Sequence, residues 1–173
     1  MLPNHFHLVV WRQADGDLSR GMHWVQNMHV RCYHRHYPSS GHVWQGRFRA
    51  FPVQEDEHLL TVLRYVERNP VRANLAARAE HWQWSNACCW QEPGLRPSYL
   101  GGGPGPQPAA WLESVNQPAT PAELAALRRC VHRGTPFGSA GWVEQTARRL
   151  HLESTLGPNG RPRKHLPSPF PEK

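Results

Sequence analysis

The sequence predicts an α+β fold with a small helical unit at its C-terminal end. Two segments, 6–11 and 42–53, carry the apolar or alternating patterns of β-strands. A stretch that begins near residue 56 repeats apolar residues at helical spacing, and two shorter helical patterns follow beyond residue 120. Strand and helix patterns both occur within the first 92 residues, before the composition shifts to proline and glycine at residue 93.

Composition points to a partner with negative charge. The chain has 173 residues, enough for one ordinary domain or a small domain with an appendage, and its net charge is +7. Its only lysines are Lys164 and Lys173, so the charge is carried mostly by arginine, whose planar guanidinium suits phosphate. This balance favours nucleic acid, although proteins that bind none can share it.

Membrane and secretion signals are not apparent in the sequence. No apolar stretch reaches the roughly 18 residues that a spanning helix needs, which predicts no membrane association. The first residues do not have the charged-then-apolar pattern of a signal peptide, so a cytoplasmic protein is expected. The spacing of the four cysteines fits neither a disulfide framework nor a CxxC zinc site, and adjacent Cys88 and Cys89 are interpreted as small buried residues rather than half a metal site.

The first strand-like segment places two histidines together. In an extended chain His5 and His7 point to the same side, while Phe6 points to the other. Two neighbouring imidazoles make half of a metal site. Taken alone, the motif favours a pair of exposed strand histidines over a metal site, and a metal site would need further ligands from elsewhere in the chain.

A helix and a basic strand come next. Asp17 is expected to cap a helix that runs to about Tyr37, where Pro38 and the following small residues end it. The segment 42–53 then alternates bulky apolar residues with polar ones, which predicts a strand with one basic face.

The second helix carries the most informative pair of residues. Asp56 is a suitable N-cap, and apolar residues recur at i, i+3, i+4 and i+7, namely Leu59, Val62, Leu63 and Val66. Tyr65 and Asn69 are four residues apart, so they share one face with about 6 Å of rise between them. A phenol and an amide can thus look out from one edge, although a helical tyrosine is ordinarily a packing residue.

The rest of the chain divides by composition. Residues 93–120 are rich in proline and glycine and predict a linker between residues 1–92 and a helical unit at 121–157. Within that unit, 121–131 and 139–150 are expected to be helices, arranged as a helix-turn-helix or as a generic helical hairpin. Residues 158–173 are basic and proline-rich and predict a disordered tail.

Several motifs, taken in order, resemble one known family. They are MLPNHFHLVV, GHVWQGRFRAFPV, LLTVLRYVERNPVRANL and HWQWSN, continued by RGTPFG and GRPRK near the C-terminal end. This set resembles the REP-associated tyrosine transposases, a branch of the single-tyrosine HUH transposases. The fold that the resemblance implies is a ferredoxin-like HUH nuclease domain, in which an antiparallel sheet is backed by helices.

The resemblance also implies a function. His5, His7 and Asn69 would bind a divalent metal ion, Mg²⁺ or Mn²⁺, and Tyr65 would be the nucleophile. The expected activity is cleavage and rejoining of single-stranded DNA at hairpin-forming REP repeats through a 5′-phosphotyrosine intermediate. Such a protein would need no small-molecule cofactor, would act as a monomer or homodimer, and would associate with the nucleoid.

Basic residues supply candidate DNA contacts. Those on the basic strand, on or just past the second helix, and in the tail are Arg47, Arg49, Arg64, Arg68, Arg72, Arg161, Arg163 and Lys164. The GRPRK stretch of the tail resembles a minor-groove hook, or serves as a generic phosphate-binding arm. The tryptophans Trp44, Trp82, Trp84 and Trp90 could stack on bases but are expected first in the core.

One departure from the family changes the expectation. Relatives usually carry a further segment before the His-hydrophobic-His motif, so a chain that begins here would have a truncated domain lacking roughly two strands of its sheet. A late start or a gene remnant would each explain this. The runner-up function is therefore a catalytically inactive, DNA-binding remnant, and a replication initiator or relaxase of the same superfamily comes third.

Overall fold

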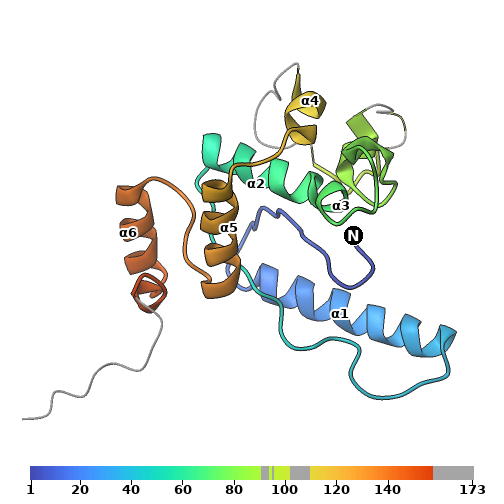
Figure 1. The fold of residues 1–173 in the computed structure, drawn as a ribbon. Coiled ribbons are helices and arrows are strands. Elements are labelled where there is room, and N and C mark those ends of the chain that lie inside the picture. The colour runs from blue at the N-terminus through green and yellow to red at the C-terminus, as the bar shows by residue number, and fades with distance from the viewer. Residues whose placement is uncertain (91–93, 95, 102–109, 158–173) are drawn as a thin grey trace, which may run out of the picture.

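The computed structural model describes residues 1–90, 94, 96–101 and 110–157, and these form a mainly helical protein (Figure 1). The tail 158–173, with Arg161, Arg163 and Lys164, lies outside the described residues. In chain order the helices are α1 (Asp17–His36), α2 (Glu57–Glu67), α3 (Asn69–Arg72), η1 (Ala79–His81), η2 (Asn86–Trp90), α4 (Trp111–Asn116), α5 (Pro121–Arg133), α6 (Ala140–Arg149) and η4 (Glu153–Thr155). None of the described helices is long and apolar enough to cross a membrane.

The predicted sheet does not occur in the part of the chain that the structure describes, which corrects the expectation of an α+β, truncated ferredoxin-like domain with an antiparallel sheet. Among the described residues there is no strand, and the only β-contact is an isolated parallel bridge between Val53 and Phe137. The segments 6–11 and 42–53 have strand-like sequences, but neither pairs with the other in a ladder of backbone hydrogen bonds. The pattern of side chains indicates only that a segment favours the extended conformation. A strand also needs a second backbone segment to pair with, and whether one is available depends on the tertiary fold.

Helix α1 begins one residue away from its expected cap. Gly16 occupies the N-cap position with a φ of +84°, a left-handed conformation that glycine adopts without strain. Asp17 is the first helical residue and accepts hydrogen bonds from Ala14 N and from Arg20. Of the residues in α1 only Met22 is buried, so most of this long helix is exposed to solvent.

Helix α2 starts as the sequence predicts. The Asp56 carboxylate accepts a hydrogen bond from His58 N at 2.8 Å, which satisfies one of the free N–H groups at the helix start. Leu59 and Val62 from the apolar stripe are buried. Arg68 keeps helical backbone angles between α2 and α3, and Pro70 lies in the first turn of α3, where its missing N–H costs nothing.

The principal core lies where α4 packs against α2 and the short helices. Ala79, Ala87, Trp111 and Val115 form its buried cluster, with Leu60, Leu63, Val71, Trp90 and Leu112 packed around it. Helix α4 lies within the segment 93–120, whose composition predicts a linker. Part of this segment packs into the core because burying the indole of Trp111 removes a large apolar surface from water.

The C-terminal helices α5 and α6 coincide with the two helices expected there and dock onto the segment before α2. Phe137 N donates to Pro52 O at 2.8 Å, and Gln54 N donates to Phe137 O at 3.0 Å. At Gly138 a Cβ atom would lie 2.6 Å from Gln54 Oε1 and from Trp142 Cε3, so only glycine allows this approach.

Candidate active site

Tyr65 and Asn69 lie on one face of the continuous turn that joins α2 to α3. Tyr65 is half-buried, and Asn69 is only 1% exposed. The buried residues Leu59 and Val62 fix the orientation of α2, so Tyr65 occupies the edge of the apolar stripe, as its sequence position predicts.

The two histidines approach this face from the N-terminal segment, which runs between α1 and α2 (Figure 1). The imidazole of His7 contacts the Tyr65 ring edge-to-face, with 5.7 Å between ring centroids. His5 Nε2 lies 3.1 Å from Asn69 Nδ2, and the two imidazoles are 5.1 Å apart between centroids. The two histidines and the pair of Tyr65 and Asn69, some sixty positions apart in the chain, thus lie close together.

Burial favours the neutral form of both imidazoles. It lowers the pKa of His7 from 6.5 to about 4, with smaller contributions from the positive charges of His5, Arg72 and the N-terminus. The pKa of His5 is also lowered, first by burial and then by the charge of Arg72. A neutral imidazole has a free lone pair on one nitrogen, which is the form that binds metal ions.

The donor set fits a divalent cation by its chemistry. Two neutral imidazoles and one amide oxygen suit Mn²⁺ at least as well as Mg²⁺, which prefers oxygen ligands throughout. His5 Nδ1 lies 2.6 Å from Asn4 Oδ1, and such a contact on the second ring nitrogen is typical of ligating histidines. Asn4 was not identified from the sequence, where Pro3-Asn4 indicates only a turn.

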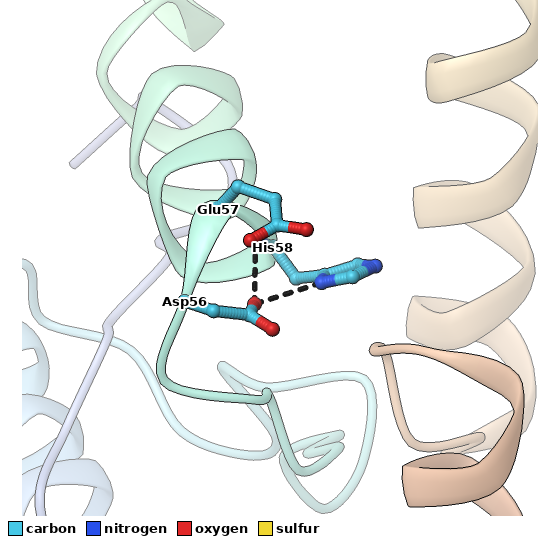
Figure 2. Close-up of side chains that lie close together, drawn as sticks. All are labelled: Asp56, Glu57 and His58. Carbon is cyan, nitrogen blue, oxygen red and sulfur yellow. Dashed lines mark hydrogen bonds and ion pairs between the residues drawn. The ribbon is translucent and has the colours of Figure 1, made fainter.

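A second group of possible ligands occurs in the described part of the chain, at the start of α2. Atoms of Asp56, Glu57 and His58 lie within 4.8 Å of one another, and Figure 2 shows the Asp56 carboxylate and the His58 imidazole turned toward each other. The Asp56 carboxylate already accepts from His58 N and lies 2.7 Å from His58 Nδ1. Helix capping accounts for this arrangement.

Three of the candidate DNA-binding arginines line a cavity beside Tyr65. The cavity has a volume of about 130 Å³, and its walls include Arg64, Arg68 and Arg72. The guanidinium of Arg72 lies over the Tyr65 ring at 4.8 Å from its centroid and donates to Asn69 Oδ1. Arg72 is exposed, so its charge is accessible from solvent.

The other candidate arginines have different surroundings. Arg64 pairs with Glu123 at 2.9 Å, and Arg68 donates to the carbonyl oxygens of Val115 and Asn116 at the end of α4. Arg49 donates to His132 O at 3.3 Å, whereas Arg47 is exposed. Arg68 therefore caps the C-terminal end of a neighbouring helix, a role that its sequence position did not suggest.

Sequence reasoning also missed Glu67, which lies between Tyr65 and Asn69 in sequence. Glu67 is 3% exposed, and its carboxylate accepts from the indole N–H of Trp111 at 2.8 Å, the indole N–H of Trp90 at 3.1 Å and Asn86 Nδ2 at 3.0 Å. An acidic residue in a helix is usually exposed, so its identity alone gives no sign of this role. Trp90 and Trp111, whose indole N–H groups need acceptors when they are buried, were the available signal.

Comparisons with known proteins point to the same part of the chain. No curated protein and no solved structure matches this chain. The segment that carries His5, His7, Tyr65 and Asn69 does match a family: residues 1–69 fit the family model described as "Transposase IS200 like".

Proposed function

We propose that this chain is a transposase-like nuclease that cleaves and rejoins single-stranded DNA at hairpin-forming repeats of the REP type. The observation that carries the proposal is the convergence of His7 on Tyr65 and of His5 on Asn69. The family match over residues 1–69 supports transposase chemistry, and the ordered motifs of the sequence support the narrower REP-associated branch.

Tyr65 performs the chemical step in this proposal. Its phenolic proton passes to solvent, and the phenolate oxygen forms a bond to the phosphorus of the scissile phosphate. The bond between phosphorus and the 3′ oxygen breaks, and that oxygen takes up a proton to become a free 3′-OH. Because the phosphate ester is retained as 5′-phosphotyrosine, attack by another 3′-OH reverses the step and rejoins DNA without ATP.

The surrounding residues position the reacting groups. His5, His7 and Asn69 would hold the divalent ion, which would neutralise charge that develops on the phosphate. The arginine-lined cavity adjoins Tyr65 and offers guanidinium groups to the DNA backbone, with Arg72 the nearest to the phenol.

Covalent capture tests the proposal. A labelled single-stranded oligonucleotide that carries a REP-type hairpin should form an adduct stable in denaturing gels, and Tyr65→Phe should abolish that adduct while changing hairpin binding by less than a few-fold. Tyr99→Phe is the matched control, because Tyr99 is 83% exposed and lies outside the site. An adduct that persists in Tyr65→Phe would remove Tyr65 from its role.

The second candidate is a DNA-binding protein without nuclease activity. It is favoured by the placement of His5 and His7 on a segment with no strand pairing among the described residues. Cleavage requires the four site residues to be held within about 0.5 Å of a productive geometry, whereas binding by dispersed arginines tolerates looser positioning. Salt-sensitive hairpin binding with no adduct in the unmodified chain would decide for this candidate.

A further inference from the structure

A chain of side-chain contacts runs from Arg72 through Asn69 and His5 to Asn4. The direction of each hydrogen bond in it can be deduced. A guanidinium only donates hydrogen bonds, so the Asn69 atom that faces Arg72 must be the amide oxygen. The other end of that amide, Nδ2, then donates to His5 Nε2 at 3.1 Å. His5 Nδ1 in turn donates to Asn4 Oδ1 at 2.6 Å.

This direction matters because an amide binds metal ions only through its oxygen. In the described arrangement Asn69 presents its NH₂ group to His5 and its oxygen to Arg72. A cation shared between His5 and Asn69 needs the oxygen on the histidine side. Turning the amide about its terminal torsion would place NH₂ against the guanidinium, where two donors would face each other.

Arg72 therefore holds Asn69 in the orientation that does not bind a cation, and among the three arginines of the cavity Arg72 is the most open to DNA. It is exposed, and it lines the cavity that Arg64 and Arg68 share. Arg64 and Arg68 already have partners in Glu123 and in the carbonyl oxygens of α4. A phosphate that enters the cavity would compete with Asn69 Oδ1 for Arg72, and a charged acceptor forms the stronger hydrogen bond.

We propose that Arg72 couples DNA binding to cation binding: its guanidinium keeps the Asn69 oxygen from His5 until a DNA phosphate draws it away. This inference rests on the proposed function, because it takes His5, His7 and Asn69 as the cation site. The coupling is reciprocal, so the cation must raise DNA affinity by the same factor by which DNA raises cation affinity. Restricting Asn69 to one orientation lowers the apparent affinity for the cation in the DNA-free protein.

Mn²⁺ binding measured by the electron paramagnetic resonance of free Mn²⁺ tests the coupling without any activity assay. In wild type a single-stranded hairpin oligonucleotide should lower the Kd for Mn²⁺ about tenfold, the equivalent of one hydrogen bond to a charged group. Arg72→Met removes every donor, so its DNA-free Kd should already be about tenfold lower, and the oligonucleotide should change it by less than twofold.

Two further variants separate this mechanism from simple charge repulsion. Arg20→Met removes the same charge from α1, where the Arg20 side chain pairs with Asp17, and should leave both Kd values as in wild type. Asn69→Asp has two equivalent oxygens, so one can face Arg72 while the other faces His5. Its absolute affinity will rise with the added charge, but the oligonucleotide effect should fall below about twofold.

The outcomes distinguish the inference from the function on which it rests. If wild type binds Mn²⁺ at a site lost in His7→Ala, but Arg72→Met and Asn69→Asp keep the full oligonucleotide effect, the coupling is refuted and the cation site stands. If no Mn²⁺ site depends on His7, both the cation site and the coupling are refuted. Thermal unfolding of each variant identifies any loss of folding, and exposed Arg72 is expected to tolerate Met.

Discussion

Tyr65 and Asn69 differ from His5 and His7 in how the chain supports them. The helix pair is part of the principal core: Asn69 is 1% exposed, and α2 and α3 contact α4 and η1. The histidines lie on an extended segment in which Leu8 is 56% exposed and Val10 is 52% exposed. One half of the candidate site is built into the core, whereas the other half lies against it.

The contacts of each half explain the difference. Beside Tyr65, the buried Glu67 carboxylate joins α2 to η2 and α4 through three N–H donors. The histidine segment is tied at its ends by Met1 N donating to Trp84 O and by Trp11 donating to Glu55 Oε1, and its histidines contact the helix half through single side-chain contacts. In between, Phe6 contacts Trp44 edge-to-face. The helix half should therefore keep its geometry when the histidine segment is perturbed, but not the reverse.

The largest expected effect comes from removing the Glu67 carboxylate. In Glu67→Ala the indole N–H groups of Trp90 and Trp111 and the Asn86 amide lose their acceptor in a buried place. Each unsatisfied buried donor costs about 1–3 kcal/mol, so a loss of about 3 kcal/mol or more in the free energy of unfolding is expected. Urea unfolding measures it.

Glu144→Ala is the matched control for that change. Glu144 is exposed and lies 3.9 Å from Arg148, so its loss should change the free energy of unfolding by less than about 0.5 kcal/mol. If both substitutions have the same small effect, the buried carboxylate does not hold the core together, and the two halves of the site are equally supported.

Local spacing predicted the helix half of the site because helical geometry is a property of neighbouring residues. The four-residue interval between Tyr65 and Asn69 fixes their shared face wherever the helix packs, and Asp56 caps the helix as expected. The metal roles of His5, His7 and Asn69 and the nucleophilic role of Tyr65 came from the family resemblance and stay predictions.

The rest depended on contacts between distant parts of the chain. The strand patterns of 6–11 and 42–53 did not reveal that, among the described residues, these segments form no ladder and 42–53 makes only the isolated bridge between Val53 and Phe137. Nor could proline and glycine content show that Trp111 would anchor α4 in the core. The sequence suggests a DNA contact for Arg68 and no role for Glu67, and only the positions of α4 and η2 give these two residues their partners.

Lowering the pH should weaken the histidine half selectively. The pKa of His7 is about 4 in the folded protein because of burial, against 6.5 for an ordinary histidine. Between these values the unfolded chain binds a proton that the folded protein does not, so the free energy of unfolding should fall as pH drops from about 6.5 to about 4. His7→Phe keeps a ring against Tyr65 but cannot take up the proton.

Urea unfolding at pH 7 and pH 5 gives the loss of unfolding free energy between the two pH values for each protein. The contribution of His7 is the loss in wild type minus the loss in His7→Phe. Wild type should lose more stability between the two pH values than His7→Phe does, since the variant retains only the contributions of other groups. An identical loss in both proteins would mean that His7 is as accessible to water as in the unfolded chain, and that the histidine segment does not rest against α2.

The smallest effect is expected at Leu8, and it is the sharpest test of how the histidine segment is packed. Truncating a leucine in a covered strand lowers a protein's free energy of unfolding by about 2–5 kcal/mol, because burial and packing are lost together. Leu8 is 56% exposed and its segment has no strand partner in the described structure, so Leu8→Ser should change the free energy of unfolding by less than about 0.5 kcal/mol. Leu127→Ala in α5 provides the contrast, since Leu127 is 1% exposed and should cost about 2–5 kcal/mol. A comparable loss from both substitutions would show that the histidine segment is packed as firmly as the core, and would remove the difference between the two halves of the site.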